Sequence, residues 1–156
     1  RIHQAVDDLD QVVRQIRSTI FELHATASAT GGVRRRLLRV ADDLAGALGF
    51  SPSFRFDGPV DTRVDDDLAE DLAAVVGEAL ANVARHAGAH RAEVIVGVGD
   101  RLVATVDDDG TGPGPARADG QGLANLAARA EARGGEVSLE ARTEGGTRLR
   151  WSVPLT

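Results

Sequence analysis

The chain has 156 residues, 42% of them hydrophobic, and a formal net charge of −6, which suits one folded domain with its own core. The acidic balance argues against nucleic-acid binding, and no apolar run approaches the roughly 20 residues of a membrane helix. We therefore expect no nucleic acid partner, no membrane contact by this chain and a cytoplasmic setting.

Three residue types are absent. The lack of cysteine excludes disulfides and thiol catalysis. The lack of methionine leads us to expect a fragment of a longer protein. Lysine is also missing, because all 18 basic residues are arginine, and this excludes both the phosphate-loop NTPase motif and the protein-kinase strand lysine.

The predicted elements follow in chain order. Apolar residues at helical spacing predict helices over 7–24 and 33–48, the second stopping at Gly49. A short strand and loop follow around Phe54 and Phe56, and then the longest helix, over 65–87. Strands are predicted at 92–98, 102–106, 137–141 and 147–153, with a glycine-rich stretch at 107–122 and a helix at 123–133. This order predicts an α+β fold, a two-layer sandwich with helices against one face of a mixed, mainly antiparallel sheet.

The long helix carries the first candidate site. At 100° per residue, Glu78, Asn82, Arg85 and His86 fall within an arc of about 100°. A carboxylate and an amide four residues apart can hold a hydrated Mg²⁺, and a neighbouring arginine can meet a phosphate. The same stripe can also be read as an ordinary solvated helix face.

The glycine-rich segments carry further candidate sites. The run from Asp107 to Gly114 directly follows a strand, which would hold its first carboxylate rigidly, although a solvated turn or a calcium loop is an alternative. Gly120-Gln121-Gly122-Leu123 lies where a helix begins, and free backbone N–H groups there suit an anion. Gly145-Gly146-Thr147, taken alone, indicates only a hairpin turn.

Taken together, these segments resemble the ATP-binding domain shared by histidine kinases, type II topoisomerases, Hsp90 chaperones and mismatch-repair ATPases. The resemblance covers about residues 35–155 and is greatest to the histidine kinases, in particular the nitrate-sensor-like branch, which includes actinobacterial redox and gas sensors. It is carried by four motifs in the family's order, namely Glu78-x-x-x-Asn82-x-x-x-His86-Ala87, Asp108-Asp109-Gly110-Thr111-Gly112, Gly120-x-Gly122-Leu123 and Gly146-Thr147.

The resemblance implies a Bergerat-type ATP-binding fold and the catalytic domain of a two-component sensor histidine kinase. Such a domain uses ATP and Mg²⁺ to phosphorylate a histidine on the kinase's own dimerisation and phosphotransfer domain, which then serves a response regulator. Residues 1–30 would be the end of the dimerisation helix and a linker, and residues 31–156 the ATP-binding catalytic domain.

The resemblance also implies a role for each matched residue. Asp108 would accept the adenine amino group, supported by Thr147. Asn82 and Glu78 would hold Mg²⁺, and Glu78 would also act as general base or orient the attacking imidazole. The remaining matched residues would lie near the phosphates or let the backbone approach the nucleotide: Arg85, His86, Gly110, Gly112, Gly120, Gly122 and Leu123. The catalytic set would be Glu78, Asn82 and His86.

The sequence departs from the family pattern in three respects. Asp109 stands where asparagine is usual and adds negative charge near an anionic ligand. The lid, about residues 113–119, is very short. None of the four histidines is followed by an acidic residue, so the phosphoacceptor motif is missing and we expect no autophosphorylation by this chain alone. An anti-sigma-factor-type serine kinase and a degenerate nucleotide-binding module without catalysis remain alternatives.

Overall fold

A computed structural model describes residues 4–6, 8–13, 15–16, 32–114 and 120–155. The elements in the two longer ranges run in the order α2 (Val33–Leu48), β1 (Ser53–Asp57), α3 (Val60–Arg63), α4 (Asp66–Asn82), η1 (Val83–Ala87), β2 (Ala92–Val98), β3 (Arg101–Asp108), α6 (Gln121–Glu131), β4 (Glu136–Ala141) and β5 (Thr147–Pro154). Within the described residues, no helix is both long enough and apolar enough to cross a membrane.

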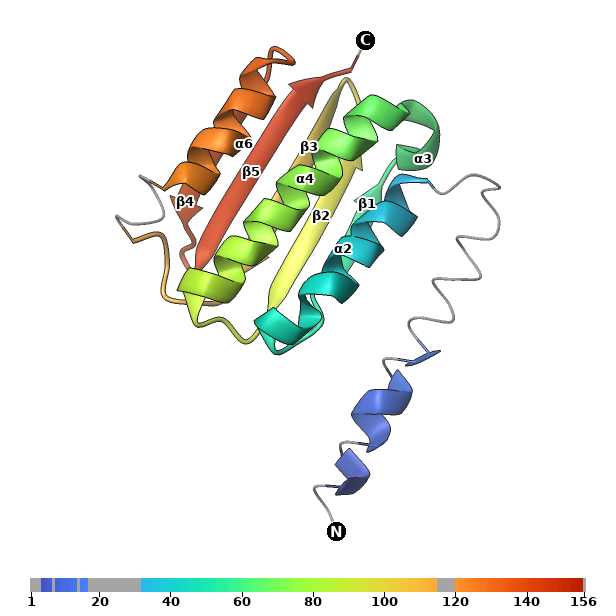
Figure 1. Ribbon diagram of the computed structural model, residues 1–156, viewed down its shortest axis with the longest axis vertical. Helices are drawn as coiled ribbons and strands as arrows, with labels where there is room; N and C mark the ends of the chain where they lie inside the picture. Colours follow the sequence, from blue (N-terminus) through green and yellow to red (C-terminus); the bar gives the residue numbers. More distant parts are fainter. Residues whose placement is uncertain (1–3, 7, 14, 17–31, 115–119, 156) are drawn as a thin grey trace.

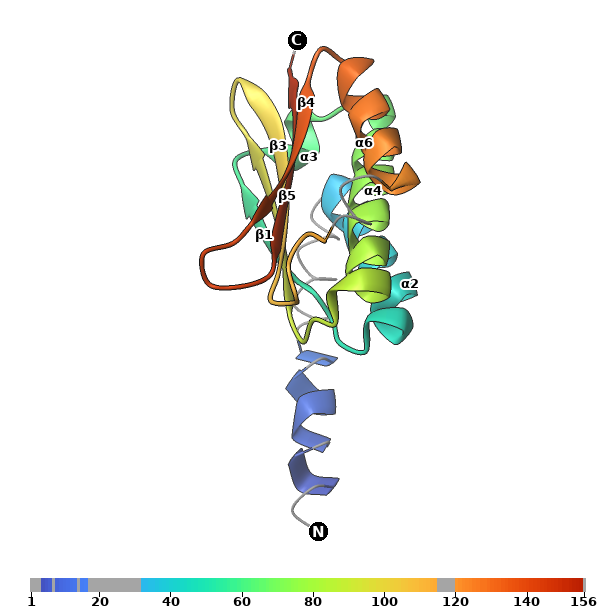
Figure 2. The ribbon, with the colours of Figure 1, turned by 90° about the vertical axis from the view of Figure 1, so that its left-hand side faces the viewer.

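The five strands form one sheet in the order β1-β2-β3-β5-β4. Only β1 and β2 run parallel; the other three pairs are antiparallel. Helices α2, α4 and α6 cover one face of this sheet, as the side view shows (Figure 2). The predicted two-layer α+β sandwich with a mixed, mainly antiparallel sheet is therefore confirmed.

The core lies between the sheet and these helices. Alternate residues of the inner strands point into it, including Val94, Leu102 and the fully buried Trp151, and they meet the apolar stripe of α4, which includes Leu72 and Leu80. The alternation follows from the pleat of the strands, which sends every second side chain to the same face.

The boundaries of the helices follow from their end residues. Gly49 ends α2 in the left-handed region with φ of +80°, as predicted. The Asp65 side chain caps α4 by accepting from the backbone N–H of Leu68 at 2.8 Å. Helix α3 was not predicted, because a four-residue helix has no apolar period to detect.

The N-terminal residues that the structure describes, at 4–6, 8–13 and 15–16, are helical. Their apolar side chains are exposed, with exposed fractions from 45% at Val13 to 63% at Leu9. The predicted helix over 7–24 is thus confirmed only where it overlaps these residues, and its part at 17–24 lies outside the described residues.

Candidate active site

The four predicted motifs lie at one end of the sandwich. Figure 1 shows the end of α4, the start of α6, the end of β3 and the start of β5 at the same edge. The register explains part of this arrangement, because Asp108 at the end of β3 pairs with Ala92, only a few residues after α4 and η1.

The first motif does not lie on one continuous α-helix. The α-helical hydrogen bonding ends at Asn82, and Val83–Ala87 form a π-helical turn that ends at Gly88, with φ of +57°. The prediction of a regular helix over 65–87 is wrong for this last turn. A π turn holds more residues per turn than an α-helix, so it changes the direction of side chains such as Arg85 and His86; such turns frequently occur at functional sites.

Despite the π turn, the four predicted residues of the motif come together. One nitrogen of the Arg85 guanidinium, Nη2, donates to Glu78 Oε1 at 3.2 Å and to Asn82 Oδ1 at 3.0 Å. These three residues and His86 line a cavity of about 360 Å³. A carboxylate oxygen and an amide oxygen therefore converge on one positive group at the cavity wall.

The start of α6 lines the same cavity with Gly120, Gly122 and Leu123. A Cβ atom on Gly122 would lie 2.3 Å from Glu78 Oε1 and 3.2 Å from Asn82 Nδ2. Because these distances leave almost no room for a side chain, a glycine lets the helix start approach α4 without displacing Glu78. The start of α6 therefore packs directly against the side chains of Glu78 and Asn82.

Two further side chains line the cavity for which the sequence predicted no role, although Gln121 lies within the predicted anion-binding segment. Gln121 and Asn125, one turn apart on α6, are linked by a hydrogen bond of 3.2 Å from Gln121 Nε2 to Asn125 Oδ1. Their side chains are polar and exposed, like many on a helix surface, so the sequence contained no signal that separated them from ordinary surface residues.

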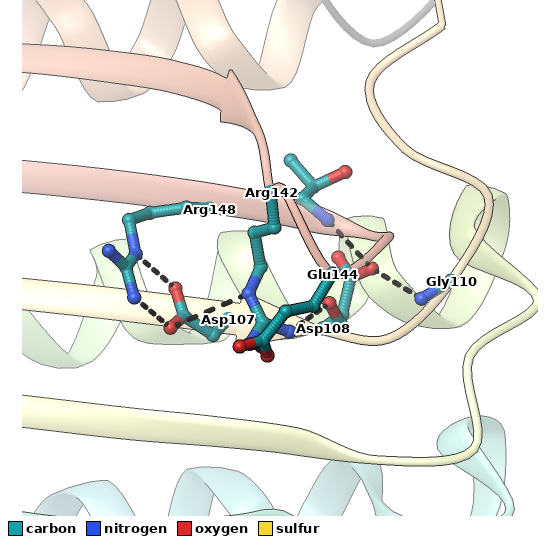
Figure 3. Close-up of polar contacts among 7 residues, drawn as sticks. Asp107, Asp108, Gly110, Arg142, Glu144 and Arg148 are labelled. Atoms are coloured by element: carbon teal, nitrogen blue, oxygen red, sulfur yellow. Dashed lines mark hydrogen bonds and ion pairs between the residues drawn. The ribbon is translucent and has the colours of Figure 1, made fainter.

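Asp108 is the centre of a second group of residues at the end of β3 (Figure 3). Its side chain is buried, and its Oδ1 accepts the backbone N–H of Gly110 at 2.9 Å and of Thr147 at 3.2 Å. The first glycine motif and the final motif are therefore joined through this carboxylate. Thr147, which the resemblance assigns a role beside Asp108, contacts it through its backbone N–H.

Two glycines make this close approach possible. Gly146 has φ of +89°, and a Cβ there would lie 1.9 Å from the backbone oxygen of Asp108. Gly112 has φ of +92° and lies near the backbone oxygen of Gly146. At Gly146 a side chain would collide with the Asp108 backbone. At Gly112 a side chain is disfavoured because residues with a Cβ rarely adopt a positive φ.

The cavity beside α4 and α6 is not lined by Asp108, Gly110, Gly112 or Thr147 among the described residues. The predicted site residues thus form two groups at one edge, one around Glu78 and Asn82 and one around Asp108. The lid residues 115–119 lie outside the described residues, as do His3 and His24.

The Asp109 carboxylate is held by the backbone of the loop that precedes β2. Its Oδ1 accepts the backbone N–H groups of His90 and Arg91, both at 2.8 Å, and the Arg91 guanidinium lies 3.6 Å from its Oδ2. These hydrogen bonds lower the pKa of the Asp109 carboxyl, and the largest effect comes from the backbone N–H of Arg91. Together they outweigh desolvation, which acts in the opposite direction. The carboxylate fixes the loop between η1 and β2, so its charge is balanced locally.

The donor set beside the cavity fits Mg²⁺. This ion prefers oxygen ligands and usually takes only one or two from the protein, with phosphates and water completing its shell. Glu78 and Asn82 offer one carboxylate and one amide oxygen that already meet at a cation, the Arg85 guanidinium. The described residues include no cluster of three or more histidine, aspartate or glutamate side chains that would form a metal cage of its own.

Comparison with known proteins defines the class. Residues 67–156 match the model of the histidine kinase-, DNA gyrase B- and HSP90-like ATPase family. The chain therefore belongs to this ATPase family, and within it is an ATP-binding catalytic domain of the sensor histidine kinase type.

Individual relatives agree with this assignment. The chain is 33% identical over 162 residues to the sensor histidine kinase NarS of Mycobacterium tuberculosis, which covers 99% of this chain and 37% of that protein. It is 28% identical over 147 residues to the sensor histidine kinase YxjM of Bacillus subtilis, covering 93% of this chain and 35% of that protein. The chain thus spans little more than a third of the length of these relatives.

A solved structure supports the fold assignment. The ATP-binding domain of PrrB from Mycobacterium tuberculosis superposes with a TM-score of 0.62 at 25% identity, over 80% of this chain and 95% of that chain. The resemblance deduced from the four motifs is therefore confirmed.

Proposed function

We propose that this domain transfers the γ-phosphoryl group of ATP to a histidine on the dimerisation and phosphotransfer domain of the same sensor kinase, from which the phosphoryl group passes to a response regulator. The observation that carries this proposal is the meeting of Glu78 and Asn82 with Arg85 beside the helix start at Gly122. This arrangement places metal-ligating oxygens, a cation and free backbone N–H groups around one cavity, as phosphate binding and transfer require.

Each group has a role in the proposed reaction. The backbone N–H groups at the start of α6 and the Arg85 guanidinium bind phosphate oxygens, and His86 lies on the same wall. Asn82, with Glu78, holds Mg²⁺, which neutralises phosphate charge when it is bound. An imidazole nitrogen of the acceptor attacks the γ-phosphorus, and the bond from the γ-phosphorus to the oxygen bridging the β- and γ-phosphates breaks, releasing ADP. Glu78 orients the imidazole or takes its proton.

The buried Asp108 supplies the adenine end of the site. One oxygen of its carboxylate is fixed by the backbone of Gly110 and Thr147, so the group can present an acceptor in a set direction to the adenine amino group. Gly110 and Gly112 keep the backbone close to the nucleotide.

The division of the chain is part of the proposal. Residues 31–156 form the catalytic domain, which is supported by the packing of α2 into the same core as α4. Residues 1–30 form the end of the dimerisation helix and a linker, which is supported by the exposed apolar side chains between Val6 and Ile16.

Calorimetric titration with ATP, with and without Mg²⁺, tests the nucleotide site. We expect binding by the parent, stronger with Mg²⁺, and loss of binding in Asp108→Ala. The matched control is Asp100→Ala, which removes an exposed aspartate from the turn between β2 and β3, at the opposite end of the sheet (Figure 1). Equal affinity in the parent and Asp108→Ala would contradict the adenine assignment.

A degenerate module would bind nucleotide without transfer, and a serine kinase would phosphorylate a different side chain. The acid lability of the product separates these cases, because phosphohistidine is lost in acid whereas phosphoserine is retained. The local pairing of Asp109 weakens one argument for degeneracy, since its carboxylate accepts the backbone N–H groups of His90 and Arg91 and faces the Arg91 guanidinium.

A further inference from the structure

An arginine from the hairpin between β4 and β5 contacts the segment that carries Asp108. Arg142 lies just after β4, and its Nη1 donates to the backbone oxygen of Asp108 at 2.9 Å (Figure 3). Its own backbone N–H donates to the oxygen of Gly146 at 3.0 Å, and Gly146 is the residue that packs against the same Asp108 oxygen. Arg142 therefore touches both segments that hold the Asp108 carboxylate.

The neighbouring residue Asp107 adds to this contact. Asp107 is buried, and the Arg148 guanidinium binds it through two hydrogen bonds of 2.8 and 2.6 Å. Arg142 Nε lies 3.9 Å from Asp107 Oδ2, so Arg142 faces the Asp107 carboxylate while it binds the Asp108 carbonyl. The buried Asp107 carboxylate thus faces two guanidinium groups. Arg148 binds it directly, and Arg142, which lies farther away, donates to the carbonyl of Asp108.

The burial of these groups gives the contact its strength. The side chain of Arg142 is only 25% exposed, although it stands in a surface hairpin. A hydrogen bond from a charged donor in such a position is stronger than one in open water, because the surroundings screen it less. The exposed Glu144, at 85% exposure and 3.4 Å from Arg142 Nη2, adds little by comparison.

We propose that Arg142 is a positioning residue for adenine recognition: it fixes the backbone of Asp108, and through it the carboxylate that meets the adenine amino group. This inference rests on the proposed role of Asp108. It extends the nucleotide site to a residue outside all four motifs, on the hairpin that links β4 and β5. Its effect is on the affinity for adenine and not on the phosphoryl transfer step.

The test compares two nucleotides, ATP and purine riboside triphosphate, which lacks the 6-amino group. Titrations are run on the parent, Arg142→Ala and Arg142→Lys. If Arg142 acts through Asp108, Arg142→Ala binds ATP about tenfold more weakly, in line with the loss of one charge-assisted hydrogen bond. Its affinity for the analogue falls much less, so the preference for ATP shrinks. Arg142→Lys restores part of the preference, because it keeps the charge but not the guanidinium fork.

Two variants control for changes unrelated to the carbonyl contact. Arg150→Ala removes another arginine, two residues beyond Arg148 on β5, whose nearest carboxylate is Glu136 at 3.9 Å. Glu144→Gln removes the exposed partner of Arg142 and leaves its contacts to Asp107 and Asp108 in place. Both keep the parent's preference for ATP. The fluorescence of Trp151, the single tryptophan of the chain, reports whether each variant is folded.

The possible outcomes separate the inference from the function on which it rests. Equal loss of affinity for both nucleotides in Arg142→Ala would overturn the inference and leave a purely structural arginine, as would no loss at all. If Arg142→Ala does not fold, Arg142→Lys and Arg142→Met are compared in the same titrations, with the same criterion. A parent that binds ATP but does not distinguish it from the analogue would refute the adenine role of Asp108, and the inference with it, while leaving ATP binding itself intact.

Discussion

The contact between Gly122 and α4 predicts a variant that loses activity while it keeps its fold. A Cβ in Gly122→Ala would lie 2.3 Å from Glu78 Oε1, well inside the 3.0 Å that such contacts keep. The carboxylate is the far end of a flexible side chain, so it can move, at the cost of a distorted rotamer and of the hydrogen bond to Arg85. These two costs together are about 1–2 kcal/mol, which corresponds to a fall in Tm of roughly 3–8 °C.

The effect of Gly122→Ala on catalysis is expected to be much larger. Displacement of Glu78 by about 1 Å, and of Asn82 by a few tenths of an ångström, misplaces the groups that hold Mg²⁺ and orient the acceptor, and such a shift lowers a rate by about 100-fold. The assay is phosphoryl transfer from radiolabelled Mg-ATP to a separately supplied dimerisation domain, with Tm measured in parallel.

Gly46→Ala is the matched control for this variant. Gly46 lies in α2 and has no atom within 4 Å of the added Cβ, so the substitution is expected to stabilise the helix by about 0.5–1 kcal/mol and leave the rate unchanged. Transfer by Gly122→Ala at the parent rate would contradict this expectation, because the catalytic groups would then tolerate the displacement.

Three further variants test other contacts. Asp71→Ala removes the carboxylate on α4 that binds Arg129 at 2.7 Å and Arg133 on α6, and we expect a loss of about 1–2 kcal/mol in denaturant unfolding; unchanged stability would be contrary to this. Arg85→Ala is expected to weaken ATP binding about tenfold in calorimetry but not adenosine binding, since the guanidinium lies on the phosphate side; equal losses would contradict that placement. The pKa of Asp109 is lowered on folding, so its contribution to stability is present above the unfolded value near 4 and is lost as the pH falls through the lower folded value. The Tm difference between the parent and Asp109→Asn should therefore shrink below about pH 4, and a difference constant from pH 7 to pH 3 would exclude this linkage.

The order of the elements and the layer to which each belongs could be predicted from the sequence. The apolar periodicity predicts the start of α2 at Val33, and Gly49 predicts its end. The alternation of Leu149, Trp151 and Val153 predicts the inner face of β5. These features depend on local chain geometry, which side-chain patterns report directly.

The features that were missed depend on contacts between distant segments. The π turn at Val83–Ala87 does not change the apolar pattern, since Val83 remains buried, so periodicity cannot reveal it. The parallel pairing of β1 with β2 is a matter of topology that neither strand encodes alone.

The candidate site also combines features that local chain geometry reveals with features that depend on contacts between distant segments. Glu78 and Asn82 could be found because they share a helix face, and they do meet at one cavity. The role of Asp109 at the His90–Arg91 backbone and the contact of Arg142 with the Asp108 carbonyl could not be found, because residues 18 and 34 positions apart come together only in the folded chain.

The most direct test of the proposed function is the transfer of phosphate to a histidine. The domain is mixed with the dimerisation and phosphotransfer domain of its kinase and with radiolabelled Mg-ATP, beside Asn82→Ala as the inactive control. We expect an acid-labile phosphoryl group on the supplied domain with the parent and none with Asn82→Ala. ATP binding without any transfer to that domain would contradict the account and leave a nucleotide-binding module.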